Sequence, residues 1–355
     1  MAIFSLLQDP NSYVADTWDI TNDEAARTYW IDAFGQAKET ILSAARQCLV
    51  TDHQGLEGAI ARSRQSYEKI IGEMRRRPER FKPFTLFTFD KIHQEILEEN
   101  GLQDPFLKIK HQENVKACSQ YKRLITAHEK LDAKSLIRVL TEGIFAGNIF
   151  DLGCQKTSQE YYQNGLDFFH TMDHLTPHPW LVDDYLPWSE FFLSRCNHWK
   201  RIVFFVDNAG PDFVLGCVPL ARILAKRGAT VVLASNDHPC LNDMTVPECR
   251  AVLRALAEDD PILRYLLQTR RIRLAGSGNG YPLIDFKNIS ETCDQAARNA
   301  DLLILEGMGR AVESNWHARF RCPTLKIAML KNEWIAKQLN GKVYDLICRL
   351  EVPKT

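Results

Sequence analysis

The sequence lacks the features that would place the protein in a membrane or beside a strongly charged partner. None of its apolar runs is long enough to span a bilayer, and the apolar start Met1–Leu7 has no basic residues, so we expect no signal peptide. The formal net charge of −1 gives no electrostatic reason to expect nucleic acid or an anionic membrane as a partner. These absences favour a globular protein that works away from membranes and nucleic acids.

Cysteine is present without a metal-binding or disulfide pattern. The ten cysteines are scattered, and no two of them form a C-x-x-C pair, so the spacing of a zinc knuckle is missing. Several lie in apolar segments, where a reduced cysteine packs as a small hydrophobic side chain. We therefore expect reduced cysteines and a cytoplasmic location.

The chain also lacks internal repeats, low-complexity stretches and a complete G-x-G-x-x-G loop after a strand. It has 355 residues, of which 45% are hydrophobic and 25% charged, as in ordinary globular domains. Apolar residues at three- and four-residue spacings predict helices at Ala25–Val50, Gly55–Arg77 and Ala133–Phe145. A further helix is expected to begin with Asp104 as its N-cap and Pro105 in its first position.

The second half alternates short apolar runs with stretches that can form helices. The predicted strands are Arg201–Val206, Ala229–Ser235, Ile272–Ala275, Asp301–Leu305, Thr324–Leu330 and Val343–Leu350, the last with an antiparallel orientation left open. The predicted helices between them are Phe213–Arg227, Pro247–Gln268, Ser290–Asn299 and roughly 312–320, with a kink or late start expected near Gly216 and Pro219. This order predicts an α/β domain with a mainly parallel sheet at residues 141–355, behind a helical region at residues 1–140.

Polar and charged residues follow each predicted strand, and in an open α/β sheet the carboxyl ends of the strands are where ligands bind. The residues at these ends are Asp207, Asn208, Gly210 and Asp212; then Asn236, Asp237, Asn242 and Asp243; then the loop 276–280 (GSGNG); then Glu306 to Arg310; and finally Lys331 and Asn332. Carboxylate and amide oxygens suit Mg²⁺ or Mn²⁺. The two positively charged side chains, Arg310 and Lys331, suit a phosphate group. The combination predicts metal-assisted phosphate chemistry.

Each of these features has a simpler explanation when taken alone. Asp207 and Asn208 could form an Asx turn, Asp243 could cap a helix, and Lys331 could lie on the surface. GSGNG could be a plain loop, because a short glycine cluster is weak evidence for nucleotide binding. The placement of all five sets at one sheet edge favours a site over five independent coincidences.

Five motifs together resemble a known family: FVDNAGPD, LASNDHPCLND, LLILEGMGRAVESN, LKIAMLKN and the upstream GIFAGNIFDLG. They are similar to the metal-dependent damage-control phosphatases with an ARMT-like domain. Within that family they look most like stand-alone plant proteins and the C-terminal domain of pantothenate-kinase-like fusions. The resemblance runs through roughly residues 100–350, whereas the first 95 match only in helical character. Since we find no kinase domain, we expect the stand-alone form.

The resemblance implies a three-layer α/β/α, Rossmann-like domain carrying an N-terminal helical region. It also implies a divalent metal ion (Mn²⁺, Mg²⁺, Co²⁺ or Ni²⁺) held by Asp207, Asn208 and Asp243. Lys331 matches a phosphate contact of the family. The residues that the resemblance assigns to the substrate pocket or its surroundings are Asn148, Asp151, Ser277, Glu306, Gly307 and Arg310.

By this resemblance, a water attacks the phosphorus of a small phosphomonoester, with Asp207, Asp243, Glu306 and Lys331 as catalytic residues. Either Asp243 or Glu306 could serve as the general base, and the sequence does not choose between them. An aspartyl-phosphate on Asp207 is disfavoured, because Ala209 stands where such enzymes normally carry a second Asp. With Asp207 and Asn208 (the DN pair) assigned to the metal, Asp212 is expected to be a helix cap.

The implied substrate is 4'-phosphopantetheine or its oxidised, damaged forms, which would place the protein in coenzyme A metabolism. Three alternatives stay open. They are a sugar-phosphate phosphatase of the same family, an S-adenosylmethionine-dependent methyltransferase that uses the GSGNG loop, and a non-catalytic module that binds a phosphorylated metabolite.

Overall fold

A seven-stranded sheet forms the centre of the computed structural model, which describes residues 1–48, 53–149 and 167–353. The strands are β1 (Val182–Asp183), β2 (Arg201–Phe205), β3 (Thr230–Ser235), β4 (Ile272–Gly276), β5 (Leu302–Glu306), β6 (Thr324–Met329) and β7 (Leu346–Glu351). Their order is β1-β7-β6-β5-β2-β3-β4. Neighbours from β6 to β4 are parallel, and β7 is antiparallel to β6. The predicted mainly parallel sheet is confirmed.

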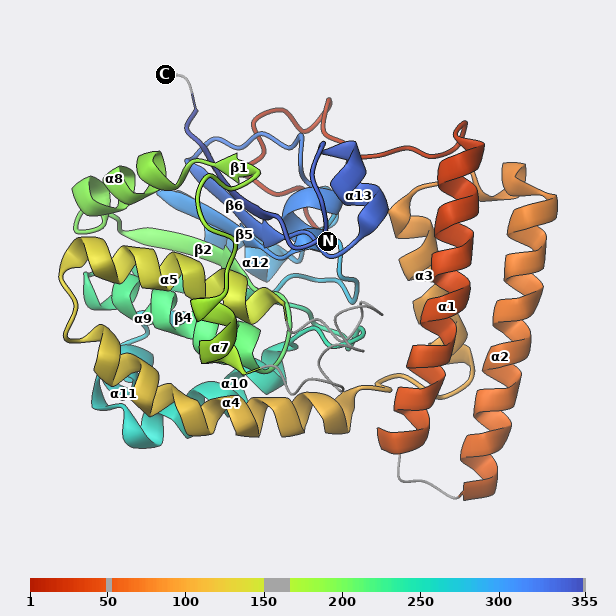
Figure 1. Ribbon diagram of the computed structural model, residues 1–355, viewed down its shortest axis with the longest axis horizontal. Helices are drawn as coiled ribbons and strands as arrows, with labels where there is room; N and C mark the ends of the chain where they lie inside the picture. The colour runs from red at the N-terminus through yellow and green to blue at the C-terminus, as the bar shows by residue number, and fades with distance from the viewer. Residues whose placement is uncertain (49–52, 150–166, 354–355) are drawn as a thin grey trace.

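Helices and loops cover both faces of the sheet, so the body has three layers (Figure 1). One face packs on α4 (Leu107–His128), α5 (Ala133–Asn148), α9 (Val218–Lys226) and α10 (Val246–Asp259), with α7 (Phe168–Asp173), α8 (Tyr185–Arg195) and α11 (Pro261–Gln268) nearby. The other face packs on the first residues of the chain, α12 (Glu291–Ala297) and α13 (Glu333–Gln338).

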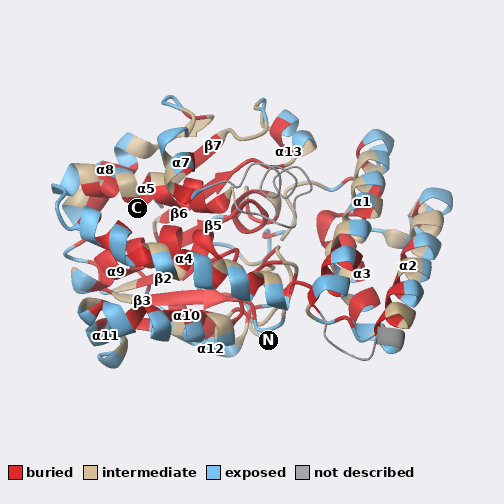
Figure 2. Cartoon of the chain, turned by 60° about the horizontal axis from the view of Figure 1, so that its bottom comes forward, coloured by how far each residue is buried: buried red, intermediate tan, exposed pale blue. Residues whose placement is uncertain are grey.

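Both faces of the sheet are buried because its strands carry apolar residues without interruption. Along β2, Ile202 and Phe204 point into one core, whereas Val203 and Phe205 point into the other. Figure 2 shows the strands as buried and the outward faces of the surrounding helices as exposed. A sheet buried on both sides leaves its strand ends as the place where polar groups can meet a ligand.

Three helices stand apart from this body at one side of the molecule (Figure 1): α1 (Glu24–Cys48), α2 (His53–Arg76) and α3 (Leu86–Glu99). They share a core of their own in which the ring of Phe34 contacts those of Tyr67 and Phe89, with centroids 5.4 and 5.5 Å away. The expected N-terminal helical region is therefore present.

The division into residues 1–140 and 141–355 stays a prediction. α5 passes through the expected border and packs on the sheet body, as α4 does. None of the helices in the described ranges is long and apolar enough to cross a membrane.

Two predicted helices differ from the structure for identifiable reasons. α4 begins at Leu107 rather than beside Asp104, whose carboxylate accepts a hydrogen bond from Lys110 Nζ at 3.1 Å. The helix predicted at 312–320 is wrong, because only a π-helical turn forms, at Gly309–Glu313. The Gly309 carbonyl accepts from the Ser314 N–H at 3.0 Å and from the Ser314 hydroxyl at 2.7 Å, so Ser314 closes the turn with both its backbone and its side chain.

The late start expected near Gly216 and Pro219 is confirmed. A π-helix at Asp212–Cys217 precedes α9, which begins at Val218. Gly216 lies against the backbone of α5: a Cβ there would come within 3.1 Å of the Gly143 carbonyl oxygen. This close approach fixes α5, and with it Asn148 at its end, next to the strand ends.

Candidate active site

The loops after β2 and β3 are joined by backbone hydrogen bonds, and this brings three of the predicted residues together. Asn208 forms an antiparallel bridge with Asp243, and the Met244 N–H donates to the Asp207 carbonyl at 2.9 Å. All three residues are buried, and the most exposed of them, Asp207, is 5% exposed. Two residues that follow β2 and one that follows β3 therefore meet at the sheet edge.

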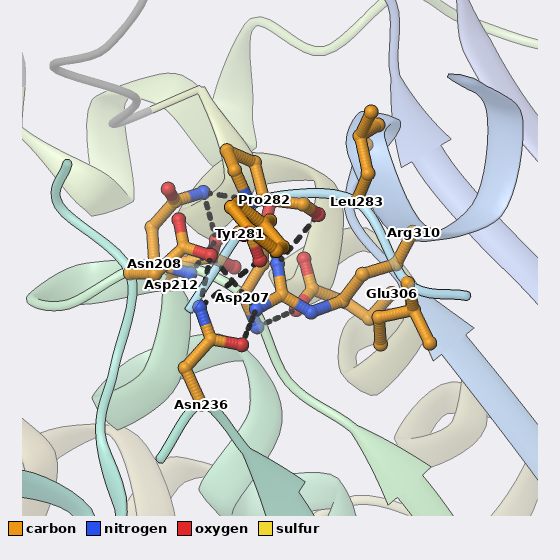
Figure 3. A network of polar contacts seen from close by, with 12 residues as sticks. Asp207, Asn208, Asp212, Asn236, Tyr281, Pro282, Leu283, Glu306 and Arg310 are labelled. Carbon is orange, nitrogen blue, oxygen red and sulfur yellow. Dashed lines mark hydrogen bonds and ion pairs between the residues drawn. The ribbon is translucent and has the colours of Figure 1, made fainter. Parts of the chain in front are cut away.

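Arg310 pairs with the carboxylates of both Asp207 and Asp243, and Figure 3 shows it beside Asp207 and Asn236. It comes from the π-helical turn after β5, and its guanidinium forms ion pairs with Asp207 and, at 2.8 Å, with Asp243. Nη2 also donates to Asn236 Oδ1 at 3.3 Å. Because Arg310 is 1% exposed, it compensates two buried negative charges from within the protein.

Glu306, at the end of β5, is hydrogen bonded to Asp207 and Asn148. Its carboxylate accepts hydrogen bonds from the Asp207 N–H and from Asn148 Nδ2, both at 2.8 Å. Burial raises the pKa of Glu306 well above its usual value, the nearby charge of Asp212 raises it further, and Lys331 opposes the shift. Glu306 is fully buried and does not line the cavity described below.

The structure corrects the expected role of Asp212, which is not a helix cap. The cap position of its helix is Pro211, without a side-chain hydrogen bond. The Asp212 carboxylate instead accepts from Asn208 Nδ2 at 2.9 Å, and its second oxygen, Oδ1, is buried with no partner among the described residues. With Cys217 and Glu306 it forms a group whose possible ligand atoms lie within 4.8 Å of one another.

The pKa of Asp212 is raised, mainly by burial, while the charge of Lys331 acts in the opposite direction. Asp212 is thus a residue of the site to which the sequence analysis, although it placed it at a strand end, gave no role in the site. It stands in the same stretch, FVDNAGPD, as the DN pair, and its position after a strand end was the available signal. Asn236 is a second such residue, since its Nδ2 donates to Asp243 at 3.0 Å.

Lys331 and Gly307 complete the strand ends next to Asp207. Lys331 follows β6, is 2% exposed and lines the cavity. Gly307 has φ +96°, and a Cβ at this position would collide with the Asp207 carboxylate. Its role in the structure is therefore to let Asp207 approach, because any side chain would fill the space that this carboxylate occupies.

One predicted residue is not brought to the site, and another lies outside the described residues. Ser277 lies at the end of β4, where its hydroxyl donates to Asn279 Oδ1 at 3.0 Å, and it is not among the residues that line the cavity. Asp151 lies outside the described residues. Asn148, from the same predicted motif as Asp151, contacts Glu306 and Asp212.

A cavity of about 460 Å³ opens above these strand ends. Asp207, Asn208, Asp243 and Lys331 line its polar end. The helices α1 and α3 line the opposite wall. A pocket of this volume accommodates a small organic molecule.

The residues at the polar end fit a divalent cation. Asp207 and Asp243 offer carboxylate oxygens, and Asn208 offers Oδ1 because its Nδ2 donates to carboxylates. All three belong to loops held by one backbone bridge, so their spacing is fixed before any ligand arrives. Oxygen donors of this kind are those that hard divalent ions prefer.

The fold and the site together define a class of protein. A mainly parallel α/β sheet with oxygen ligands, a lysine and an arginine at its carboxyl edge is the arrangement of enzymes that act on phosphate esters with a metal ion. Residues 30–347 match the model of the damage-control phosphatase ARMT1-like domain. The chain belongs to this family, a family of metal-dependent phosphatases.

Relatives with curated names agree with this assignment. The chain is 36% identical over 285 residues to a damage-control phosphatase of Arabidopsis thaliana, covering 80% of this chain and 77% of that protein. It is 31% identical to the 4'-phosphopantetheine phosphatase of Mus musculus over 98% of this chain and 48% of the mouse protein. It is 30% identical to pantothenate kinase 2 of Arabidopsis thaliana over 99% of this chain and 42% of that protein. The chain thus spans less than half of the length of the last two.

A solved structure shares the fold. The DUF89 family protein of Pyrococcus horikoshii has a TM-score of 0.57 with this chain at 16% sequence identity. The similarity covers 90% of this chain and 96% of that protein, so it includes the N-terminal helices as well as the sheet.

Proposed function

We propose that the protein hydrolyses small phosphomonoesters with the help of a divalent metal ion, and that 4'-phosphopantetheine or its oxidised forms are its substrates. The observation that carries the proposal is the cavity whose polar end combines Asp207, Asn208, Asp243 and Lys331. The name of the mouse relative, a 4'-phosphopantetheine phosphatase, supports the choice of substrate. The metal, Mn²⁺, Mg²⁺, Co²⁺ or Ni²⁺, would be held by Asp207, Asn208 and Asp243.

When bound, such an ion supplies a Lewis acid for a phosphate oxygen and makes a water more acidic. The remaining roles belong to the chain. The Lys331 ammonium binds and stabilises the phosphoryl oxygens as negative charge develops on them. Arg310 forms ion pairs with both Asp207 and Asp243 and does not line the cavity, so we assign it the role of holding these two carboxylates in position.

Of the two candidate general bases, the geometry supports Asp243. Asp243 lines the cavity, whereas Glu306 is fully buried behind Asp207 and accepts that residue's N–H. A general base has to reach the attacking water directly or through one water. We therefore propose that Glu306, together with Asn148 and Asp212, holds Asp207 and Asn208 in position and does not transfer a proton.

The other hypotheses have less support. The methyltransferase reading depended on the GSGNG loop, and Ser277 of that loop does not line the cavity. A module that only binds a phosphorylated metabolite has little need of the buried acids Asp207 and Asp243. A sugar-phosphate phosphatase is the second candidate, because Asp207, Asn208, Asp243 and Lys331 suit a metal ion and a phosphate whatever group the phosphate is attached to.

The proposal is tested by replacing Asp207 with alanine. We expect Asp207→Ala to lower metal-dependent hydrolysis of 4'-phosphopantetheine at least about 100-fold, because it removes one of the three proposed ligands of the metal ion that stabilises the reacting phosphate. Asp259→Ala, at an exposed position, is the matched control and is expected to retain wild-type activity. Activity of Asp207→Ala at the wild-type rate would refute the site. The wild type is also assayed against oxidised phosphopantetheine and a panel of sugar phosphates.

We place this reaction in the cytoplasm, with a small phosphorylated metabolite as the partner. All nine cysteines in the described part of the chain are free, which suits a reducing compartment. Growth of the organism and cell fractionation with an antibody to this chain would test the location.

A further inference from the structure

The wall of the cavity opposite the strand ends is formed by one face of α1 and by α3. The cavity-lining residues of α1 are Tyr29, Trp30, Ala33, Phe34, Gln36, Ala37, Thr40 and Ile41. Their spacing of three and four residues places them on one side of the helix. Ala33 and Ala37 lie one turn apart there, and their small side chains leave room that a larger residue would fill.

From α3, the ring of Phe89 and the side chains of Asp90 and His93 complete this wall. His93 packs its ring on Phe34 at 4.2 Å between centroids and bonds the Tyr67 hydroxyl through Nδ1 at 2.9 Å. Burial lowers the pKa of His93 to about 3, so its imidazole is neutral. The wall therefore combines an apolar, aromatic surface with several polar side chains, those of Tyr29, Gln36, Thr40, Asp90 and His93.

Two of its polar groups are suited to hydrogen bonds with a ligand. The indole N–H of Trp30 is buried and has no partner among the described residues. Asp90 presents a carboxyl to the cavity, and burial, together with the charge of Asp16, raises its pKa to about 7. A carboxyl in this state both donates and accepts hydrogen bonds near neutral pH. An uncharged amide or hydroxyl in a ligand would satisfy both groups.

We propose that the α1–α3 wall is a specificity pocket for an uncharged, amphipathic tail attached to the phosphate, with Ala33 and Ala37 providing its depth and Asp90 hydrogen bonding to the tail. This inference rests on the proposed phosphatase function and concerns the part of the substrate that the residues at the strand ends would not bind. The N-terminal helices α1 and α3 would then determine which phosphomonoesters the protein prefers.

The lining argues against two other tails. A sugar carries a hydroxyl on nearly every carbon, and burying those hydroxyls against Phe34, Phe89 and Trp30 would leave many of them without partners. A nucleotide or bisphosphate would bring a second negative charge near Asp90, Glu313 and Glu333, which also line the cavity. A long chain of methylene and amide groups meets neither difficulty.

The test compares three phosphomonoesters on the full-length protein: 4'-phosphopantetheine, which has a long amphipathic tail, a hexose 6-phosphate, and glycerol 3-phosphate, which has almost no tail. The wild type is expected to prefer phosphopantetheine over the hexose phosphate by about 10-fold or more in kcat/KM, the discrimination that filling an apolar pocket gives. Equal or better use of the hexose phosphate would overturn the proposal.

Ala37→Phe fills the pocket from α1. We expect the ratio of kcat/KM for phosphopantetheine to that for glycerol 3-phosphate to fall about 10-fold, mainly through KM. Ala25→Phe makes the same change at an exposed position of α1 and is expected to keep the wild-type ratio. An unchanged ratio in Ala37→Phe, in protein that melts like the wild type, would overturn the proposal.

Asp90→Ala provides a second test, which removes the carboxyl without adding bulk. It should raise the KM for phosphopantetheine about 5-fold more than the KM for glycerol 3-phosphate, the size of one hydrogen bond to the tail. Glu95→Ala, at an exposed position of the same helix, is its control. Equal effects on both substrates would contradict tail recognition. If the wild type hydrolysed none of the three esters, the proposed function itself would fail, which is a different result.

Discussion

At the scale of single residues, His93 shows how the wall of the cavity depends on a neutral side chain. It is buried between Phe34 and Tyr67, and its pKa lies at about 3 instead of 6.5. Between these two pH values the unfolded chain binds a proton that the folded chain excludes. Protonation of the unfolded state therefore removes stability as the pH falls below 6.5.

This gives a prediction for His93→Gln, which keeps a polar side chain but cannot titrate. The free energy of unfolding of the wild type, relative to this variant, should fall by roughly 1.4 kcal/mol for each pH unit between 6 and 4. Urea unfolding at several pH values measures the difference. His111→Gln, at an exposed position of α4, should show no comparable trend. A pH-independent difference for His93→Gln would contradict the neutral imidazole.

At the scale of elements, Asp260 links three helices. It caps α11 by accepting from the Ile262 and Leu263 N–H groups at 3.0 and 3.1 Å. It also accepts from Arg222 Nε on α9 at 2.6 Å and from the Tyr121 hydroxyl on α4 at 3.1 Å. Because Asp260 and Arg222 are each 2% exposed, removal of the carboxylate would leave a buried guanidinium without its main partner.

Asp260→Ala is therefore expected to lower the free energy of unfolding by about 3–5 kcal/mol, the cost of breaking a buried ion pair from one side. Asp132→Ala removes another helix cap, that of α5, at an exposed position and should cost only about 1 kcal/mol. Chemical denaturation of the two variants gives the comparison. Similar losses in both would show that the buried pair adds little beyond the cap.

The elements themselves were largely predictable from local pattern. Apolar runs such as Arg201–Val206 identify the strands, since a sheet covered on both faces needs uninterrupted hydrophobic residues. The failures have local causes that periodicity does not carry. At 312–320 the expected helix is replaced by a turn, because the side chains of Ser314 and Asn315 bond the carbonyls of Gly309 and Arg310. Such competition depends on side-chain rotamers.

The site was predictable only where strand ends mark it. Asp207, Asn208, Asp243 and Lys331 follow predicted strands, and parallel strands bring their carboxyl ends to one edge. The wall from α1 was not predictable, because nothing in a helix sequence says which distant surface it faces. The carboxyl of Asp212 was misassigned for a related reason: its bonds to Asn208 and Asn148 depend on how α5 packs.

At the scale of the whole molecule, the buried acids link metal binding to stability. An ion held by Asp207, Asn208 and Asp243 would bind the folded chain alone, because Asp243 lies far along the sequence from the other two and meets them only in the fold. Such a ligand at 100 times its Kd stabilises the fold by about 2.7 kcal/mol. We expect MnCl₂ to raise the Tm of protein that was first treated with EDTA.

In Asp207→Asn this increase in Tm should be lost or strongly reduced, because the change removes one charged ligand. Asp259→Asn, which makes the same change at an exposed position, should behave like the wild type. Differential scanning calorimetry over a MnCl₂ titration provides the measurement. The same shift in all three proteins would mean that the ion binds elsewhere.

The antiparallel bridge between Asn208 and Asp243 has a consequence for how such chains can diverge. Strand pairing sets side-chain direction with a period of two, so the pairing itself, rather than the number of residues between the acids, determines which way Asp243 points. Insertions at the exposed residues Asp237 and His238 would lengthen a loop and leave Asn208 paired with Asp243. A single residue added between Asp243 and Met244 would break the Met244 bond to Asp207 and turn the carboxylate away from its partner.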